Sequence, residues 1–300
     1  MMQRRAFLTT LAAAGASSLL ASRGASAQAK KVQQPYRLRY APHLSILDKE
    51  LTIPQRLELI AEHGFDATEY NGLLNHPLGE VAEIRRKLDD LGIEMGIFVA
   101  NPGGWRTAGL VDPRQRDAFL EEIKKTVEYH KVIGNHSVTT LTGPALPGVS
   151  RSTQRRNVIE GLKRSTDLLD KTELALTIEP LNPIDHPGFF MVHSDELAEI
   201  IAAVDNPHVR MLFDFYHLQI SEGNLINNFR AYFDLIGYVQ LGDVPGRKEP
   251  GTGEINHRNV FKAVYERGYR GILGMEHGRS LPGMPGVLKM FEAYKEADKW

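Results

Sequence analysis

Residues 174–179 read Leu-Ala-Leu-Thr-Ile-Glu, an apolar run of strand length that ends on a carboxylate. The same pattern returns at 211–214, which read Met-Leu-Phe-Asp, and at 273–276, which read Leu-Gly-Met-Glu. Short, nearly continuous apolar runs are typical of strands buried on both faces in parallel sheets. The repeated ending therefore predicts parallel strands whose carboxyl ends bring acidic side chains to one edge.

Runs of strand length alternate along the chain with longer stretches in which apolar residues have helical spacing. The expected strands are 37–40, 67–70, 93–99, 137–141, 174–178, 209–213, 236–241 and 271–275. The expected helices are 77–91, 113–133, 152–171, 194–204, 259–267 and 285–299. A doubly wound open sheet is the competing arrangement, but eight repeats favour a single closed (β/α)8 TIM barrel, an α/β fold of about 250 residues. We expect this barrel over residues 36–300.

The first residues differ from the rest of the chain and predict an export signal. They contain a twin arginine at 4–5, small or apolar residues over 6–21, and an Ala-Ser-Ala cleavage site at 25–27. The apolar run is shorter than the about 20 residues of a spanning helix. We expect a twin-arginine signal over 1–27, a linker over 28–35, a periplasmic location and no stable membrane insertion after signal removal. A membrane-anchoring helix is the alternative interpretation.

The composition excludes several classes of site. Cysteine is absent, which excludes disulfides, a thiolate nucleophile and cysteine-ligated metals. The chain has 36 basic and 37 acidic residues, and loss of residues 1–27, with three arginines and no acid, leaves 33 − 37, a net charge of −4. This balance offers no general attraction to nucleic acid. We expect a small-molecule keto acid or sugar as partner and no nucleic acid; formation of a homo-oligomer is left open.

Five of the expected strands end on an acidic or amide side chain: Glu69, Glu179, Asp214, Gln240 and Glu276. Barrel active sites form at the carboxyl ends of the strands. A carboxylate that follows an apolar strand needs a cation or a proton to be tolerated there. All of the five except Glu69 are expected metal ligands, because together they offer the all-oxygen donor set that suits Mg²⁺ or Mn²⁺. A helix cap or a surface ion pair is the alternative for any one of them.

Three further residues are expected around the same mouth. His217 follows Asp214 by three residues and can point back as a hydrogen-bond partner for the substrate. Arg247 lies in a glycine-rich loop and can hold a carboxylate with a bidentate fork. Trp105 follows the third expected strand, where its ring can cover the site. With Glu69 these are the expected substrate-binding residues; a structural histidine, a solvated arginine and loop packing are the alternatives.

Several sequence blocks carry a resemblance to a known family. Residues 178–182 read Ile-Glu-Pro-Leu-Asn, 187–190 read Pro-Gly-Phe-Phe, 214–219 read Asp-Phe-Tyr-His-Leu-Gln, and 243–256 read Asp-Val-Pro-Gly-Arg-Lys-Glu-Pro-Gly-Thr-Gly-Glu-Ile-Asn. This ordered series resembles the hydroxypyruvate isomerase family, within the xylose isomerase-like barrels that also contain ketose 3-epimerases and endonuclease IV. Weaker similarity extends back through Trp105 to Leu44-Ser45, so the resemblance covers nearly the whole mature chain.

The resemblance implies that Glu179 and Glu276 are the catalytic acid/base pair and that, with Asp214 and Gln240, they hold the metal. Epimerase relatives usually have histidine where this chain has Gln240, which favours the isomerase branch. Two features depart from the family: the export signal, and His277 at a position where the family more often has tyrosine.

The implied reaction is an aldose–ketose type isomerisation, most like conversion of hydroxypyruvate to tartronate semialdehyde. A cation bound to adjacent carbonyl and hydroxyl oxygens acidifies the intervening C–H, one glutamate removes the proton, and a glutamate returns it to the neighbouring carbon. A periplasmic keto-sugar epimerase or lyase needs the same groups and stays open, as does a non-catalytic sugar- or metal-binding barrel. An endonuclease needs more histidine ligands and a basic face, and the acidic mature chain opposes it.

Overall fold

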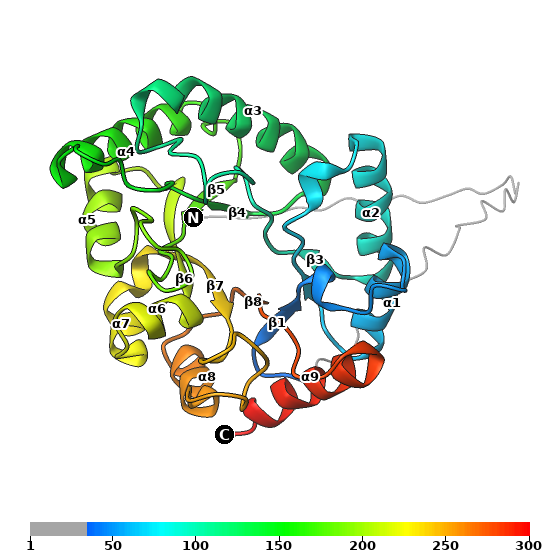
Figure 1. Cartoon of the computed structure of the whole chain (residues 1–300). Coiled ribbons are helices and arrows are strands. Elements are labelled where there is room, and N and C mark those ends of the chain that lie inside the picture. Colours follow the sequence, from blue (N-terminus) through cyan, green and yellow to red (C-terminus); the bar gives the residue numbers. More distant parts are fainter. Residues whose placement is uncertain (1–34) are drawn as a thin grey trace, which may run out of the picture. The chain divides into compact units, whose positions relative to one another are not determined.

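Eight parallel strands form a ring inside a layer of helices, as the computed structural model of residues 35–300 shows (Figure 1). The strands are β1 Arg39–Pro42, β2 Ala67–Thr68, β3 Glu94–Met95, β4 Ser137–Thr140, β5 Ala175–Ile178, β6 Val209–Asp214, β7 Ile236–Leu241 and β8 Ile272–Met275. The fold is therefore the predicted (β/α)8 TIM barrel. The predicted export signal and linker residues 28–34 lie outside the described residues, so both stay predictions.

The helices that cover the ring are α1 Ile53–Glu62, α2 Leu78–Leu91, α3 Arg116–Ile133, α4 Arg151–Thr166, α5 Ser194–Val204, α6 Phe215–Ser221, α7 Leu225–Tyr232, α8 His257–Glu266 and α9 Gly283–Ala297. Short 3₁₀ helices lie at Leu44–Ile46, Leu73–Asn75, Pro113–Gln115 and Phe233–Leu235. Within residues 35–300, no helix has both the length and the apolar character needed to cross a bilayer.

Backbone pairing closes the ring and excludes the open sheet. Six strands pair in the order β1-β8-β7-β6-β5-β4, and β2 pairs with β3. Two parallel bridges, His43 with Glu69 and Val99 with Thr139, join these groups. The strands predicted at 67–70 and 93–99 shorten to two residues each, because beyond them pairing continues only as single bridges.

Three helices were not among the predicted ones: α1, α6 and α7. The start of α1 does have a sequence signal, since Thr52 accepts a hydrogen bond from the backbone N–H of Gln55 and the Gln55 side chain bonds back to Thr52. This reciprocal cap is the capping box that Thr-x-x-Gln indicates. A short helix such as α6 offers too few turns for its apolar spacing to be recognised.

The interior of the ring changes from apolar to polar toward the carboxyl ends of the strands. Side chains two residues apart on a strand share a face, so Leu212 lies below Asp214, and Tyr238 lies below Gln240. Leu212 and Tyr238 belong to a small buried apolar cluster to which β1, β2 and β8 also contribute. This alternation places the acidic and amide ends of the strands at one mouth of the barrel.

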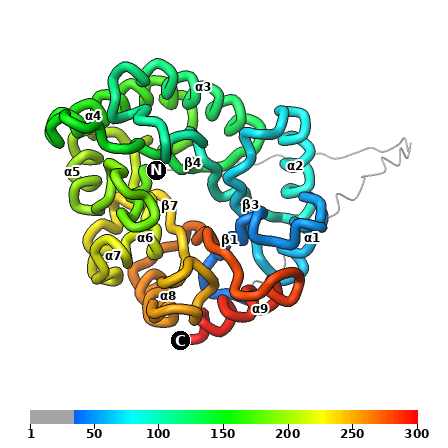
Figure 2. Tube along the Cα trace, viewed as in Figure 1, coloured from blue at the N-terminus to red at the C-terminus, as the bar shows by residue number. Residues whose placement is uncertain are grey.

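The end of the chain closes against its first strand. Figure 2 shows α9, at the red end of the colour bar, beside the blue segment of β1 and α1. Asp298 accepts hydrogen bonds from the backbone N–H of Arg37 at 2.5 Å and from the hydroxyl of Tyr40 at 2.8 Å. The rings of Phe65 and Phe291 lie 4.8 Å apart between their centres. These contacts hold α9 against β1 and against the segment between α1 and β2.

Candidate active site

A cavity of ≈ 350 Å³ lies at the carboxyl ends of the strands. One part of its wall is polar and is formed by Asn71, Glu179, His186, His217, Arg247 and Glu276. The other part is apolar and includes Val99, Trp105, Leu141 and Leu181. A mostly apolar hollow with a few converging polar groups is the usual form of a small-molecule site.

Glu179, Asp214 and His217 come together on one side of this cavity. The ligand atoms of all three lie within 4.8 Å of one another, and all three side chains are buried. His217 Nε2 is 3.7 Å from Glu179 Oε1 and 3.6 Å from Asp214 Oδ2. Asp214 caps the start of α6 by accepting from the backbone N–H of Tyr216 at 2.8 Å. The helix that begins there brings His217 back toward the residue that caps it.

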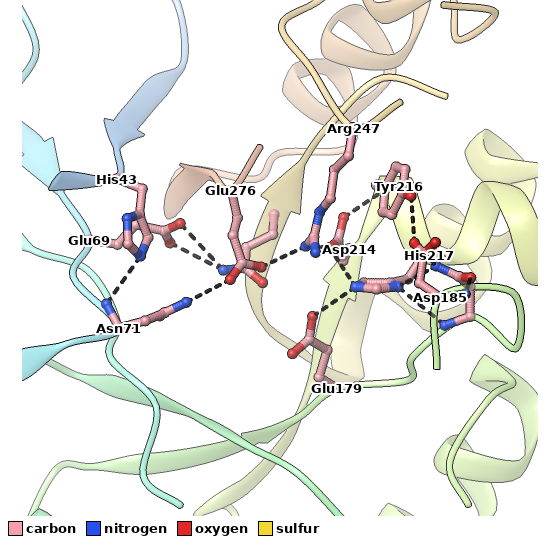
Figure 3. A network of polar contacts seen from close by, with 12 residues as sticks. His43, Glu69, Asn71, Glu179, Asp185, Asp214, Tyr216, His217, Arg247 and Glu276 are labelled. Carbon is pink, nitrogen blue, oxygen red and sulfur yellow. Dashed lines mark hydrogen bonds and ion pairs between the residues drawn. The ribbon is translucent and has the colours of Figure 1, made fainter. Parts of the chain in front are cut away.

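Arg247 links the two sides of the site. Its Nη2 donates to Asp214 Oδ2 at 2.9 Å and to Glu276 Oε2 at 2.8 Å, so one guanidinium joins the carboxylates that end β6 and follow β8 (Figure 3). The backbone of Arg247 has φ 48, in the left-handed region that is uncommon for residues other than glycine. The guanidinium also lies 4.8 Å from the centre of the Tyr216 ring. The predicted carboxylate clamp thus faces the cavity but is paired with two site carboxylates.

Asp243 organises the loop that carries Arg247. Its Oδ1 accepts from the backbone N–H groups of Val244 and Ile255 at 2.9 and 3.1 Å, and its Oδ2 accepts from those of Gly251 and Gly253 at 2.9 and 2.8 Å. A Cβ at Gly253 would lie 2.0 Å from the carbonyl oxygen of Val244, so only glycine fits there. The loop that composition marked as a substrate loop is therefore held from inside by one buried carboxylate.

Asn71 is a site residue that sequence reasoning missed. It lies in the loop after β2, its backbone N–H donates to His43 Nε2 at 3.1 Å, and its side-chain Nδ2 donates to Glu276 Oε1 at 2.6 Å (Figure 3). Both oxygens of Glu276 therefore accept hydrogen bonds, one from Asn71 and one from Arg247. In the sequence, Asn71 could have been recognised as a site residue only by its position just beyond the carboxyl end of a predicted strand.

Glu69 differs from the expectation that it contacts substrate. It is fully buried and is not among the residues that line the cavity. Its carboxylate accepts from the hydroxyl of Tyr238 at 3.2 Å and lies 3.4 Å from the Nε2 of Gln240. A Cβ at Gly274 would stand 2.1 Å from Glu69 Oε2, so the glycine in β8 makes room for this charge. Glu69 is a neighbour of Gln240 in the barrel interior.

Trp105 and His277 occupy contrasting positions. Trp105 lines the cavity as expected, is 44% exposed, and carries the guanidinium of Arg106 at 3.8 Å from its ring centre. His277 follows Glu276 but is buried away from the cavity, with its Nε2 2.8 Å from the hydroxyl of Tyr294. Position 277, where the chain departs from tyrosine, therefore lies in the core next to α9 and outside the cavity wall.

Burial and crowding of like charges perturb the carboxylates. Burial, with the nearby charges of Glu276 and Asp214, raises the pKa of Glu179 well above its ordinary value. Burial also raises the pKa of Asp214 to about 6, although the Arg247 guanidinium opposes the rise. The pKa of His217 is lowered well below its ordinary value by burial and by Arg247. The site therefore favours a neutral His217 and lacks positive charge relative to its carboxylates.

This donor set fits a divalent cation. Gln240 turns its Nε2 toward Glu69, and its buried Oε1 has no hydrogen-bond partner among the described residues. An orphaned amide oxygen beside crowded, buried carboxylates is what a hard cation would satisfy. Glu276 is outside the close group of Glu179, Asp214 and His217. Of the four predicted ligands, Glu179 and Glu276 line the cavity, and Asp214 and Gln240 are paired neighbours on β6 and β7. Arg247 is bonded to two of the four.

Comparisons with known proteins identify the family of the chain. A family model described as a xylose isomerase-like TIM barrel matches residues 57–297. Hydroxypyruvate isomerase from Escherichia coli is 29% identical over 243 residues, which cover 80% of this chain and 93% of the relative. 2-Oxo-tetronate isomerase from Cupriavidus necator is 31% identical over 242 residues, which cover 80% and 92%.

Solved structures give the same result for the fold. The structure of an AP endonuclease of family 2 from Brucella melitensis has a TM-score of 0.74 and 26% identity, and covers 83% of this chain and 96% of its own. That of 3-keto-D-glucoside 4-epimerase from E. coli has a TM-score of 0.73 and 20% identity, and covers 88% and 100%. The second similarity supports the barrel alone.

Proposed function

The chain belongs to the xylose isomerase-like TIM barrel family and, within it, to the hydroxypyruvate isomerases; on this premise we propose that it is an isomerase of small 2-hydroxy-carbonyl compounds. The observation that carries the proposal is that Glu179 and Glu276, the residues that follow β5 and β8, line one cavity together with Arg247. Conversion of hydroxypyruvate to tartronate semialdehyde is the reaction that we propose first, since the relatives named above are isomerases of small keto acids.

The two glutamates differ in their surroundings, and this difference suits a proton transfer between neighbouring carbons. Glu276 has a donor on each oxygen, Asn71 and Arg247, which fixes its orientation. Among the described residues no donor lies within hydrogen-bonding distance of the Glu179 carboxylate: His217 Nε2 is 3.7 Å from its Oε1. Burial raises the pKa of Glu179. In the proposed reaction one glutamate removes the proton from the carbon that bears the hydroxyl group, and a glutamate delivers a proton to the neighbouring carbon. The hydroxyl proton passes to the former carbonyl oxygen, so the aldehyde and the new hydroxyl group form together.

Arg247 and His217 are the groups that we assign to the substrate. Arg247 supplies positive charge for the carboxylate of a keto acid, and His217 faces the same cavity. A divalent cation, when held by Glu179, Asp214, Gln240 and Glu276, would supply Lewis-acid polarisation of the adjacent carbonyl and hydroxyl oxygens. We propose Mg²⁺ or Mn²⁺ because every donor atom is oxygen.

Solvent deuterium exchange tests the proposal. Protein loaded with Mg²⁺ is incubated in D₂O with hydroxypyruvate, four-carbon 2-oxo acids and keto sugars, and exchange is followed by proton NMR. We expect exchange that disappears with EDTA and in both Glu179→Gln and Glu276→Gln, while Glu173→Gln, at a side chain that is 86% exposed, retains it.

The substrate panel also separates this proposal from the alternatives. Exchange with keto sugars but not with keto acids would replace the isomerase by an epimerase or lyase. Retained ligand binding without exchange for any substrate would overturn the enzymatic proposal in favour of a binding protein.

A further inference from the structure

The ring of His217 makes two contacts through the nitrogen that faces away from the cavity. Its Nδ1 is 3.2 Å from the backbone nitrogen of Asn182 and 2.8 Å from the side-chain Nδ2 of the same residue. A backbone N–H can only donate. The first contact therefore requires a lone pair on His217 Nδ1.

The side chain of Asn182 gives the same result because its orientation is fixed. Its Oδ1 accepts from the backbone N–H groups of Ile184 and Asp185 at 3.0 and 2.9 Å, so the oxygen is turned away from the histidine. Its Nδ2 also donates to Asp185 Oδ2 at 3.0 Å, and this carboxylate in turn accepts from the hydroxyl of Tyr216 at 2.5 Å. The amide therefore presents a donor to His217 Nδ1.

Two donors on Nδ1 leave one arrangement for a neutral imidazole. Its lone pair lies on Nδ1 and its proton on Nε2, the nitrogen that faces Glu179 and Asp214. We propose that Asn182 is a positioning residue that fixes His217 in this Nε2–H tautomer. His217 then donates a hydrogen bond to a substrate oxygen and is unable to ligate a cation through Nε2.

This inference rests on the proposed function and assigns it a specific electrostatic element. Negative charge develops on a substrate oxygen when the neighbouring carbon loses its proton, and a fixed N–H donor stabilises that charge without reorganisation. The three residues of the close group then have different roles. The carboxylates of Glu179 and Asp214 are available to bind a cation, and the imidazole of His217 binds the substrate.

The tautomer can be read directly by long-range proton–nitrogen NMR of protein labelled with ¹⁵N at histidine. The His217 signals are assigned by their absence in His217→Gln. We expect a pyridine-like Nδ1 and a protonated, pyrrole-like Nε2, both unchanged when Mg²⁺ is added. A pyridine-like Nε2, or loss of its proton on addition of Mg²⁺, would overturn the inference.

The variant Asn182→Asp tests the role of the side-chain donor with almost no change in the size of the side chain. The new carboxylate oxygen replaces the side-chain donor with an acceptor that competes with the backbone N–H of residue 182, so the tautomer of His217 is expected to shift toward Nδ1–H. We expect kcat to fall about 100-fold, the loss typical of removing one oxyanion donor, with little change in KM. Asn227→Asp, at an exposed position on α7, is the control and should change neither signal nor rate.

The two readouts separate this inference from the proposed function. The NMR measurement on the unaltered protein needs no turnover and does not depend on whether the variant folds. An Nε2–H tautomer in a protein that exchanges no substrate proton would refute the function alone. Substrate exchange by a protein whose His217 carries its proton on Nδ1 would refute the inference alone.

Discussion

At the scale of single residues, the hydrogen bond from Asn71 to Glu276 assigns a role to a side chain outside the predicted acid/base pair. Asn71→Leu keeps the approximate size of the side chain but removes the donor at 2.6 Å from Glu276 Oε1. We expect kcat to fall about 10- to 100-fold, in the range seen when groups that orient a reacting side chain are lost. Steady-state kinetics and thermal unfolding of the same preparation measure this.

Asn75→Leu, four residues further along the same loop and exposed, is the control for Asn71→Leu. It should leave the rate constant unchanged. Equal losses in both variants, or a loss that follows the fraction of unfolded protein, would show that Asn71 stabilises the loop and has no part in orienting Glu276.

Residue types at strand ends predicted most residues of the candidate site, and three-dimensional packing explains why Asn71 was missed and Glu69 was placed at the cavity. Glu179, Asp214 and Glu276 could be expected because a charge after an apolar strand is costly without a partner. The separation of Glu69 from the cavity depends on the space left by Gly274 and on the direction of the Gln240 amide. Contacts of this kind join residues on different strands, so the spacing of residues within one strand does not predict them.

At the scale of elements, one carboxylate determines the shape of the loop between β7 and α8. Asp243→Asn replaces one of two oxygens that accept backbone N–H groups with an amide that is itself a donor. We expect the free energy of unfolding to fall by about 3 kcal/mol, because charge-assisted hydrogen bonds are lost and buried donors are left unpaired. Urea unfolding monitored by circular dichroism provides the measurement.

The loop variant should also weaken substrate binding, because Arg247 is carried by the same loop: its backbone N–H donates to the carbonyl of Asp243 at 2.9 Å. Asp234→Asn, at a side chain that is 90% exposed, is the control and should lose neither stability nor affinity. A stable Asp243→Asn protein with unchanged KM would contradict the role given to Asp243.

The predicted elements show where periodicity is informative. The boundaries of α5 and β7 agree with the prediction, since both have a full pattern of apolar positions. Strands β2 and β3 are shorter than the predicted ranges 67–70 and 93–99, because beyond them backbone pairing continues only as single bridges at Glu69 and Val99. Helix α4 ends at Thr166, before the predicted residue 171, and no proline or glycine in the sequence marks that end.

At the scale of the whole molecule, buried negative charge couples stability to pH. The pKa of Asp214 is about 6 in the folded protein, above its ordinary value of 3.8, so the folded state binds more protons than the unfolded state between these values. Stability should therefore decrease as pH rises from about 4 to about 6 in the absence of a divalent cation. The loss is on the order of 3 kcal/mol for this group, at about 1.4 kcal/mol per pKa unit.

Urea unfolding in EDTA at pH 4.5 and pH 7 tests this dependence, with Asp214→Asn as the matched variant that lacks it. Addition of Mg²⁺ at about 100 times its dissociation constant should restore about 2.7 kcal/mol at pH 7 in the unaltered protein. A wild-type protein that loses no more stability than Asp214→Asn over this interval, or one that Mg²⁺ fails to stabilise, would count against the cation site.

The contacts of Asp298 with β1 have a consequence for biosynthesis. The first strand pairs with β8 and is bonded to Asp298, and both of these partners are translated more than 200 residues after it. At about 5–20 residues per second, β1 leaves the ribosome on the order of 10–50 s before its partners exist. The time for which that strand edge is open to neighbouring chains is thus set by translation rather than by the speed of folding.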